Sequence, residues 1–263
     1  MPGLGRIYQP DDRDSGFLMA RKLPDESVVS TGARLWPMPH VYDQGDSPHC
    51  VGYSCSGVLT CLAAALYNNA SVVFDAPALY AWANQHDGDK RPHDGSTVRS
   101  GLKGLQAVGD QILTSTDVEH QPLGLFDRAE NYLWANVKAH DADIDRVIGW
   151  LLTVSPIVIG IDWSKPMYDP GPDGFVHPDP NQVEGGHAIL VRGVNAVDPA
   201  NIRFCMRNSW GGSWGVTVHD DWSVTNSPPG GGDALLSRDD LIALLKANGE
   251  AGAVVEDLVP IQS

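Results

Sequence analysis

The stretch Gln44-Gly45-Asp46-Ser47-Pro48-His49-Cys50-Val51-Gly52-Tyr53 joins a turn-rich loop to the start of an apolar pattern. From there, apolar residues recur at spacings of three and four, which predicts a half-buried helix with Cys50 in its first turn. Helix N-termini carry free N–H groups and partial positive charge, and both favour a thiolate. Gln44 lies six residues upstream. The stretch therefore predicts a cysteine nucleophile with an oxyanion hole formed by Gln44 and the Cys50 N–H.

Two later segments offer the partners that such a nucleophile needs. A glycine pair precedes His187 and a strand-like apolar run, and Asn208-Ser209-Trp210-Gly211 follows, with a second Trp-Gly pair at Trp214. The order Gln, Cys, His-Ala, Asn-Ser-Trp-Gly resembles the papain-like cysteine peptidases over roughly residues 37 to 245, and only these short blocks are specific. The chain resembles a prokaryotic-type member of this family, without a long pro-region or a signal peptide.

The resemblance implies both a fold and a chemistry. It implies an α+β, two-lobed architecture, with Cys50 on the helical lobe and His187 on the β-rich lobe, facing each other across a cleft. It implies hydrolysis of peptide bonds by a Cys50–His187 thiolate–imidazolium pair, in which Asn208 orients the imidazole and Gln44 stabilises the oxyanion. Trp210 would shield the His–Asn hydrogen bond from water. No metal or cofactor is needed.

Substrate-binding residues are also expected from the resemblance, which places Gly95, Ser96, Gly186 and Trp210 in the cleft. Gly95 and Ser96 stand where relatives have a glycine-containing segment that pairs with the substrate backbone. A second interpretation stays open, in which Gly95 is only a turn and Ser96 only a helix cap. Ser47 and Val51 replace the disulfide-bonded cysteine and the tryptophan of many relatives.

Composition restricts the class of protein further. Eighteen basic and 33 acidic residues give a formal charge of −15. We therefore expect no nucleic acid or membrane partner, and a peptide or protein as substrate. There is no apolar run long enough for a transmembrane helix and no apolar start typical of a secretory signal. The cysteines lack metal-type spacing and are interpreted as reduced, which favours the cytoplasm or another reducing compartment.

The sequence divides into three predicted regions. Residues 1–36 are polar and turn-rich and are interpreted as an N-terminal arm that docks on the body without threading the cleft, because they lack the length and helical pattern of an inhibitory pro-region. Residues 37–140 form the helical lobe and residues 141–263 the β-rich lobe. Later elements include a helix after Pro77, a helix capped by Ser96, a helix capped by Asp141 or Asp143, and a buried strand over 157–161.

Two other functions remain compatible with these residues. A catalytically silent member of the same fold could serve as a binding or structural module of a larger assembly. An amidase or acyl-transfer enzyme would use the same triad, because the triad does not encode the leaving group.

Overall fold

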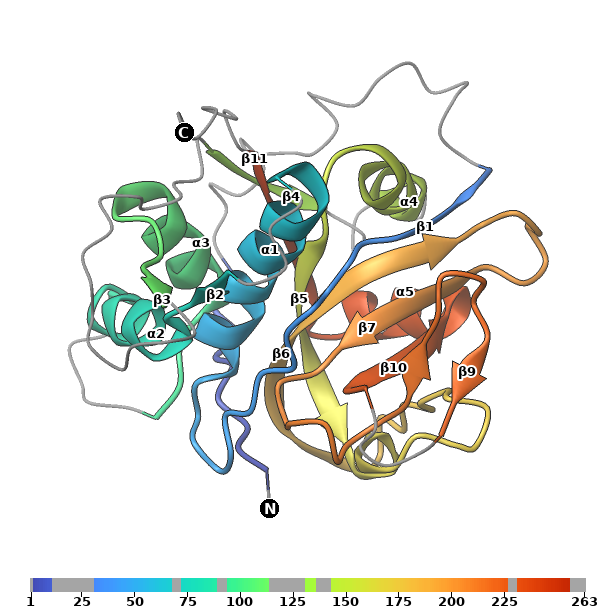
Figure 1. The fold of residues 1–263 in the computed structure, drawn as a ribbon. Helices are drawn as coiled ribbons and strands as arrows, with labels where there is room; N and C mark the ends of the chain where they lie inside the picture. Colours follow the sequence, from blue (N-terminus) through green and yellow to red (C-terminus); the bar gives the residue numbers. More distant parts are fainter. Residues whose placement is uncertain are drawn as a thin grey trace.

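The fold is built around a central antiparallel sheet, and helices cover both faces of this sheet (Figure 1). The computed structural model describes residues 2–10, 31–67, 72–88, 94–113, 131–135, 143–226 and 231–255. The helices are α1 (Cys50–Tyr67), α2 (Ala76–Gln85), α3 (Val98–Ala107), α4 (Asp143–Thr153) and α5 (Arg238–Lys246). The strands are β1 (Ala33–Leu35), β2 (Val73–Phe74), β3 (Ile112–Leu113), β4 (Asn131–Ala135), β5 (Ile157–Ser164), β6 (Val183–Asn195), β7 (Arg203–Arg207), β8 (Thr217–Val218), β9 (Val224–Thr225), β10 (Asp233–Ser237) and β11 (Glu250–Val255).

The sheet has seven strands among the described residues, in the order β10-β7-β6-β5-β11-β4, with β1 paired to β6. β5 and β6 form its long centre, in a register that places Ile161 opposite His187 and Asp162 opposite Gly186. β11 joins the other side of β5, so that Glu250 lies opposite Gly160. Residues far apart in sequence are therefore fixed side by side at one place in the sheet.

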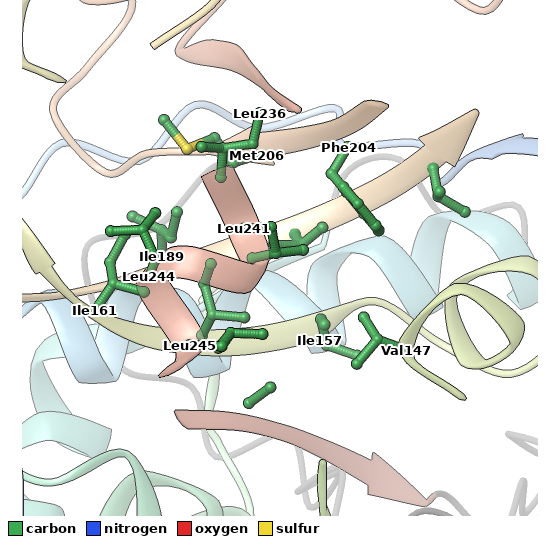
Figure 2. Packing of buried hydrophobic residues seen from close by; sticks show 14 of the residues in the cluster. Val147, Ile157, Ile161, Ile189, Phe204, Met206, Leu236, Leu241, Leu244 and Leu245 are labelled. Atoms are coloured by element: carbon green, nitrogen blue, oxygen red, sulfur yellow. The ribbon is translucent and has the colours of Figure 1, made fainter. Parts of the chain in front are cut away.

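Each face of the sheet has its own core, because side chains alternate along a strand. Val158, Ala188 and Leu190 point to one face and pack against α1 and α3. Their neighbours Ile157, Ile159, Ile161, Ile189 and Val191 point to the other face, together with α4 and α5. Figure 2 shows Leu241, Leu244 and Leu245 of α5 lying over β-strand residues of this second core. The predicted buried strand over 157–161 is confirmed, although it extends to Ser164.

The expected start signals hold for α1 and α2 but not for α3; α4 begins with Asp143 itself, and Asp141, its other expected cap, lies outside the described residues. α1 begins at Cys50, as predicted, and α2 begins after the N-cap Asp75 with Pro77 in its first turn. The prediction that Ser96 caps α3 is wrong, because Thr97 is the N-cap and accepts a hydrogen bond from the Ser100 N–H. Serine and threonine are nearly equal as caps, so the local sequence favours neither residue.

The α+β prediction is confirmed, and two sheet strands come from outside the predicted β-rich lobe. β1 belongs to the predicted arm, and β4 belongs to the predicted helical lobe. The proposed boundary at residue 140 and arm residues 11–30 lie outside the described residues. The four cysteines are buried and unpaired. Among the helices described, none combines the length and apolarity that crossing a membrane requires.

Candidate active site

Cys50 lies at the junction of α1 and the sheet, and its side chain is fully buried. The backbone N–H groups of Val51, Ala188 and Gly5 lie near its sulfur and favour the thiolate, which lowers the pKa of the thiol. Ala188 follows His187 in β6, so the thiol lies against the strand that carries the histidine. The two side chains are not joined by a hydrogen bond, because His187 Nδ1 has no hydrogen-bond partner within the described residues.

The His187 imidazole is held by Asn208, which follows β7. His187 Nε2 lies 2.9 Å from Asn208 Oδ1, and the Ser209 N–H donates to the same oxygen at 2.8 Å. The bond from the Ser209 N–H identifies this atom as the amide oxygen, which can only accept hydrogen bonds. His187 Nε2 is therefore the donor, and the lone pair of the ring lies on Nδ1. Nδ1 is buried and has no hydrogen-bond partner within the described residues. The tautomer is therefore the one that can accept a proton from a thiol.

Aromatic rings shield this imidazole. The Trp210 ring stacks on His187, with centroids 4.7 Å apart and an interplanar angle of 29°. Trp163 of β5 meets His187 edge-on, at 4.9 Å and 78°. The sequence indicates the role of Trp210 through the Asn-Ser-Trp-Gly block, but Trp163 was missed. Its only signal is an aromatic residue at the end of a buried β-branched run.

The Gln44 side chain is fixed at both ends of its amide. Its Oε1 accepts from the Ser209 hydroxyl at 2.5 Å, and its Nε2 donates to the carbonyl oxygens of Ser47, at 2.6 Å, and Gly3, at 3.1 Å. A fixed amide whose N–H group already binds a peptide carbonyl can serve as an oxyanion donor without further rearrangement. Ser209, whose hydroxyl positions this amide, was not singled out from the sequence.

The N-terminal arm enters this site, and the expectation that it avoids the cleft is wrong. Residues Gly3 to Ile7, here called the blocking segment, lie between Ser96 and Gly186. The Gly5 and Arg6 N–H groups donate to the Gly186 carbonyl at 3.1 and 3.0 Å. Ser96 donates to the Gly5 carbonyl at 2.8 Å and accepts from the Ile7 N–H at 2.8 Å, in a parallel bridge. Backbone hydrogen bonds need no helical pattern, so a short extended segment suffices.

Three of the four predicted substrate-binding residues contact the blocking segment, and two of them are glycines for a steric reason. A Cβ atom at Gly186 would lie 2.1 Å from the Arg6 carbonyl oxygen, and one at Gly95 would lie 2.3 Å from the Gly5 carbonyl oxygen. Gly95 also has φ +118°, a conformation that side chains disfavour. Ser96 contributes its backbone, as already described. Trp210 instead stacks on the histidine.

Solved structures provide the comparison. Xylellain, a cysteine protease from Xylella fastidiosa, superposes with a TM-score of 0.67 at 18% identity, covering 97% of this chain and 96% of that one. Digestive procathepsin L2 from the larval midgut of Tenebrio molitor gives a TM-score of 0.64 at 16% identity, covering 97% of this chain and 78% of that one. The chain has the papain-like fold. No protein-family model and no curated protein matches its sequence.

Within this papain-like fold, the buried site favours neutral forms of both reactive groups. Burial raises the pKa of Cys50 to about 11, although hydrogen bonds from Ala188, Gly5 and Val51 and the Arg6 charge oppose the rise. Burial also lowers the pKa of His187 to about 4, against the opposing hydrogen bond to Asn208. The thiolate–imidazolium pair expected from the sequence is therefore disfavoured while the blocking segment excludes water.

His49 precedes Cys50 in the sequence. Its ring packs against Tyr80, with centroids 4.0 Å apart and an interplanar angle of 31°. In the part of the chain that the structure describes, no group of three or more His, Cys, Asp or Glu side chains is placed to hold a metal ion.

Proposed function

We propose that the chain is a cysteine-type peptidase in which Cys50, His187, Asn208 and Gln44 act together. The observation that supports this proposal is the blocking segment, because a peptide backbone lies in the candidate site. The Gly5 N–H of this extended backbone lies near the Cys50 sulfur, and the Gly3 carbonyl accepts a hydrogen bond from Gln44 Nε2. A site that contacts a peptide backbone both at the nucleophile and at the oxyanion donor favours peptide bonds over small amides as substrates.

The proposed reaction follows from the atoms described above. The Cys50 thiol transfers its proton to His187 Nδ1, and the thiolate attacks the carbonyl carbon of the peptide bond. Gln44 Nε2 and the Cys50 N–H donate to the oxygen on which negative charge develops. The imidazolium then protonates the leaving amine, and water hydrolyses the thioester with His187 as base. Asn208 keeps Nδ1 directed to the reaction by holding Nε2–H.

In this proposal the structure is a closed form, in which the blocking segment occupies the place proposed for the substrate. Gly3 and Gly5 permit a close approach: Cβ atoms there would lie 2.0 and 2.1 Å from the carbonyl oxygens of Ser47 and Pro48. Cleavage of another peptide requires this segment to leave the site. Its departure also admits water, which favours the thiolate–imidazolium pair of Cys50 and His187.

Cleavage of a mixed peptide pool, read by mass spectrometry, tests the function in the full-length chain. Arg6→Ala removes side-chain anchors of the blocking segment and should expose the site. We expect Arg6→Ala to cleave peptides, Arg6→Ala with Cys50→Ala to be inactive, and Arg6→Ala with Cys61→Ala to remain active. Cys61 is the matched control because it is buried in the same helix.

Two outcomes would favour the other functions. If Cys50 in Arg6→Ala becomes reactive to iodoacetamide but cleaves no peptide, an amidase or acyl-transfer enzyme explains the site better. If instead Cys50 remains unreactive to iodoacetamide in every variant that weakens the blocking segment, the silent binding module is the better explanation.

A further inference from the structure

Arg6 is the only member of the blocking segment whose charged side chain is inserted into the body of the protein. This side chain is 1% exposed. Its Nε donates to Glu250 Oε1 at 3.1 Å, its Nη1 lies 3.6 Å from Asp162 Oδ1, and its Nη2 donates to the Asn248 carbonyl. Three different nitrogens of one guanidinium thus face three different acceptors, two of which are carboxylates.

The space that receives the guanidinium is built into the sheet. Gly160 forms its wall, since a Cβ atom there would lie 2.7 Å from Arg6 Nε, 2.9 Å from Glu250 Oε1 and 2.9 Å from Val98 Cγ2. Glu250 lies opposite Gly160 in the register of β11 and β5. Asn248 Nδ2 donates to Asp162 Oδ2 at 2.8 Å and so fixes the second carboxylate. These acceptors belong to the sheet or its connection, not to the arm.

This space, here called the Arg6 pocket, opens beside the candidate nucleophile. The Gly5 and Arg6 N–H groups both donate to the carbonyl of Gly186, the residue before His187, and the Gly5 N–H also lies near the Cys50 sulfur. A peptide that lay between Ser96 and Gly186 in the direction and register of the blocking segment would present one side chain to the same pocket. The pocket therefore lies where it would bind the side chain of one residue of a bound peptide, close to the reacting bond.

We infer that the Arg6 pocket is a specificity site for an arginine side chain of the substrate, which the chain's own Arg6 fills in the closed form. The inference rests on the proposed function and names its substrate class, peptides with arginine at the position that lies between Ser96 and Gly186. Arginine fits better than lysine, because its donors form a rigid planar fork while lysine carries one charged nitrogen. The alternative is a pocket that serves only to lock the arm.

Binding is measured first, without catalysis, in full-length Cys50→Ala with Arg6→Ala. The probes are fluorescein-labelled copies of residues 3–8 with arginine, lysine or citrulline at the position of Arg6; citrulline has nearly the same shape without the charge. We expect arginine to bind about tenfold or more tightly than citrulline, with lysine between them. Adding Glu250→Gln and Asp162→Asn should remove the preference. Asp145→Asn is the matched control, because Asp145 is exposed and pairs with Arg238.

Substrate choice is measured second, from the bonds that full-length Arg6→Ala cuts in a peptide pool. Enrichment of arginine at one fixed distance from the cut bond, lost in Glu250→Gln, supports the inference. Cleavage without such enrichment overturns it and leaves the peptidase standing, and the pocket is then only a lock. If no peptide is cut, the proposed function fails, and equal binding of arginine and citrulline probes overturns the inference by itself. Gly160→Ala, which narrows the pocket without removing a charge, should reduce arginine enrichment even if Glu250→Gln folds poorly.

Discussion

Two buried arginine–carboxylate clusters lie among the described residues, and they differ in where their arginines come from. In the first, Asp233 of β10 receives Arg192 of β6 and Arg207 of β7, with N···O distances of 2.6 to 2.9 Å. Arg192 also donates to the carbonyls of Trp36 and Val218. In the second, Arg6 of the arm meets Asp162 and Glu250 of the sheet.

The difference shows how one chemistry serves two purposes. The Asp233 cluster joins three neighbouring strands and cannot separate unless the sheet unfolds. The Arg6 cluster joins the sheet to a segment that belongs to no strand of the sheet and is held by a few backbone hydrogen bonds, so it can separate while the sheet persists. We therefore expect the first cluster to determine stability and the second to determine access to Cys50.

The largest effect is expected at Asp233. Asp233→Asn leaves two buried arginines without a carboxylate, and breaking a buried pair in this way costs about 3–5 kcal/mol. Urea denaturation at neutral pH measures the loss, with Asp145→Asn as an exposed control that should change little. Cys50 should not become more reactive in native conditions. A loss below about 1 kcal/mol would show that the cluster does not hold the sheet together.

Arg6→Ala should have the next largest effect, but on access to the site. We expect the closed form to lose about 3 kcal/mol relative to the open form, since a buried guanidinium and its charge-assisted hydrogen bonds are removed. This corresponds to an increase of up to about 100-fold in the rate at which iodoacetamide alkylates Cys50. The urea midpoint of the body should fall less than in Asp233→Asn.

Peptide mapping of the alkylated protein assigns the reaction to Cys50 and shows whether the other buried cysteines remain protected. An unchanged alkylation rate, in a variant whose melting curve is normal, would mean that the blocking segment does not depend on Arg6.

Acid should weaken the closed form through His187, because its pKa of about 4 lies below its ordinary value of 6.5. The unfolded chain takes up a proton between these values and the folded chain does not, so stability is complete above about pH 6.5 and declines toward pH 4. At pH 5 the loss is about 2 kcal/mol. Cys50 acts at the other limit: its pKa is raised from 9.0 to about 11, so stability falls as the pH rises through this range.

Urea denaturation at pH 7 and pH 5 measures the acid effect, and His187→Asn is the control because it lacks the titrating ring. The decrease between the two pH values should be about 2 kcal/mol smaller in this variant. Equal decreases in both proteins would mean that His187 is not buried in its neutral form.

The smallest effect is expected from reductant. The four cysteines are unpaired, so dithiothreitol should leave the melting temperature of both the wild type and Arg6→Ala unchanged. A fall of several degrees in either protein would indicate a disulfide that the structure does not contain.

Local sequence patterns predicted the elements that depend on short-range physics. The spacing of apolar residues after Cys50 predicted α1, the β-branched run predicted β5, and Pro77 after Asp75 predicted α2. The choice of Ser96 over Thr97 as a cap failed because both side chains suit that position, and the surrounding contacts decide between them. Ser96 is used instead for its backbone, by the blocking segment.

What the sequence by itself determined is the set of candidate reactive residues, because Cys50, His187, Asn208 and Gln44 stand in short blocks with characteristic neighbours. Only the tertiary structure decided what covers them. Arg6 and Glu250 are 244 positions apart, and neither shows a periodicity or motif that links them. Their contact depends on the pairing of β11 with β5 and on the space left by Gly160. The arm is polar and aperiodic, so its sequence predicts a surface segment. Backbone hydrogen bonds hold it in the site, and because every sequence can form such bonds, no residue pattern reveals them.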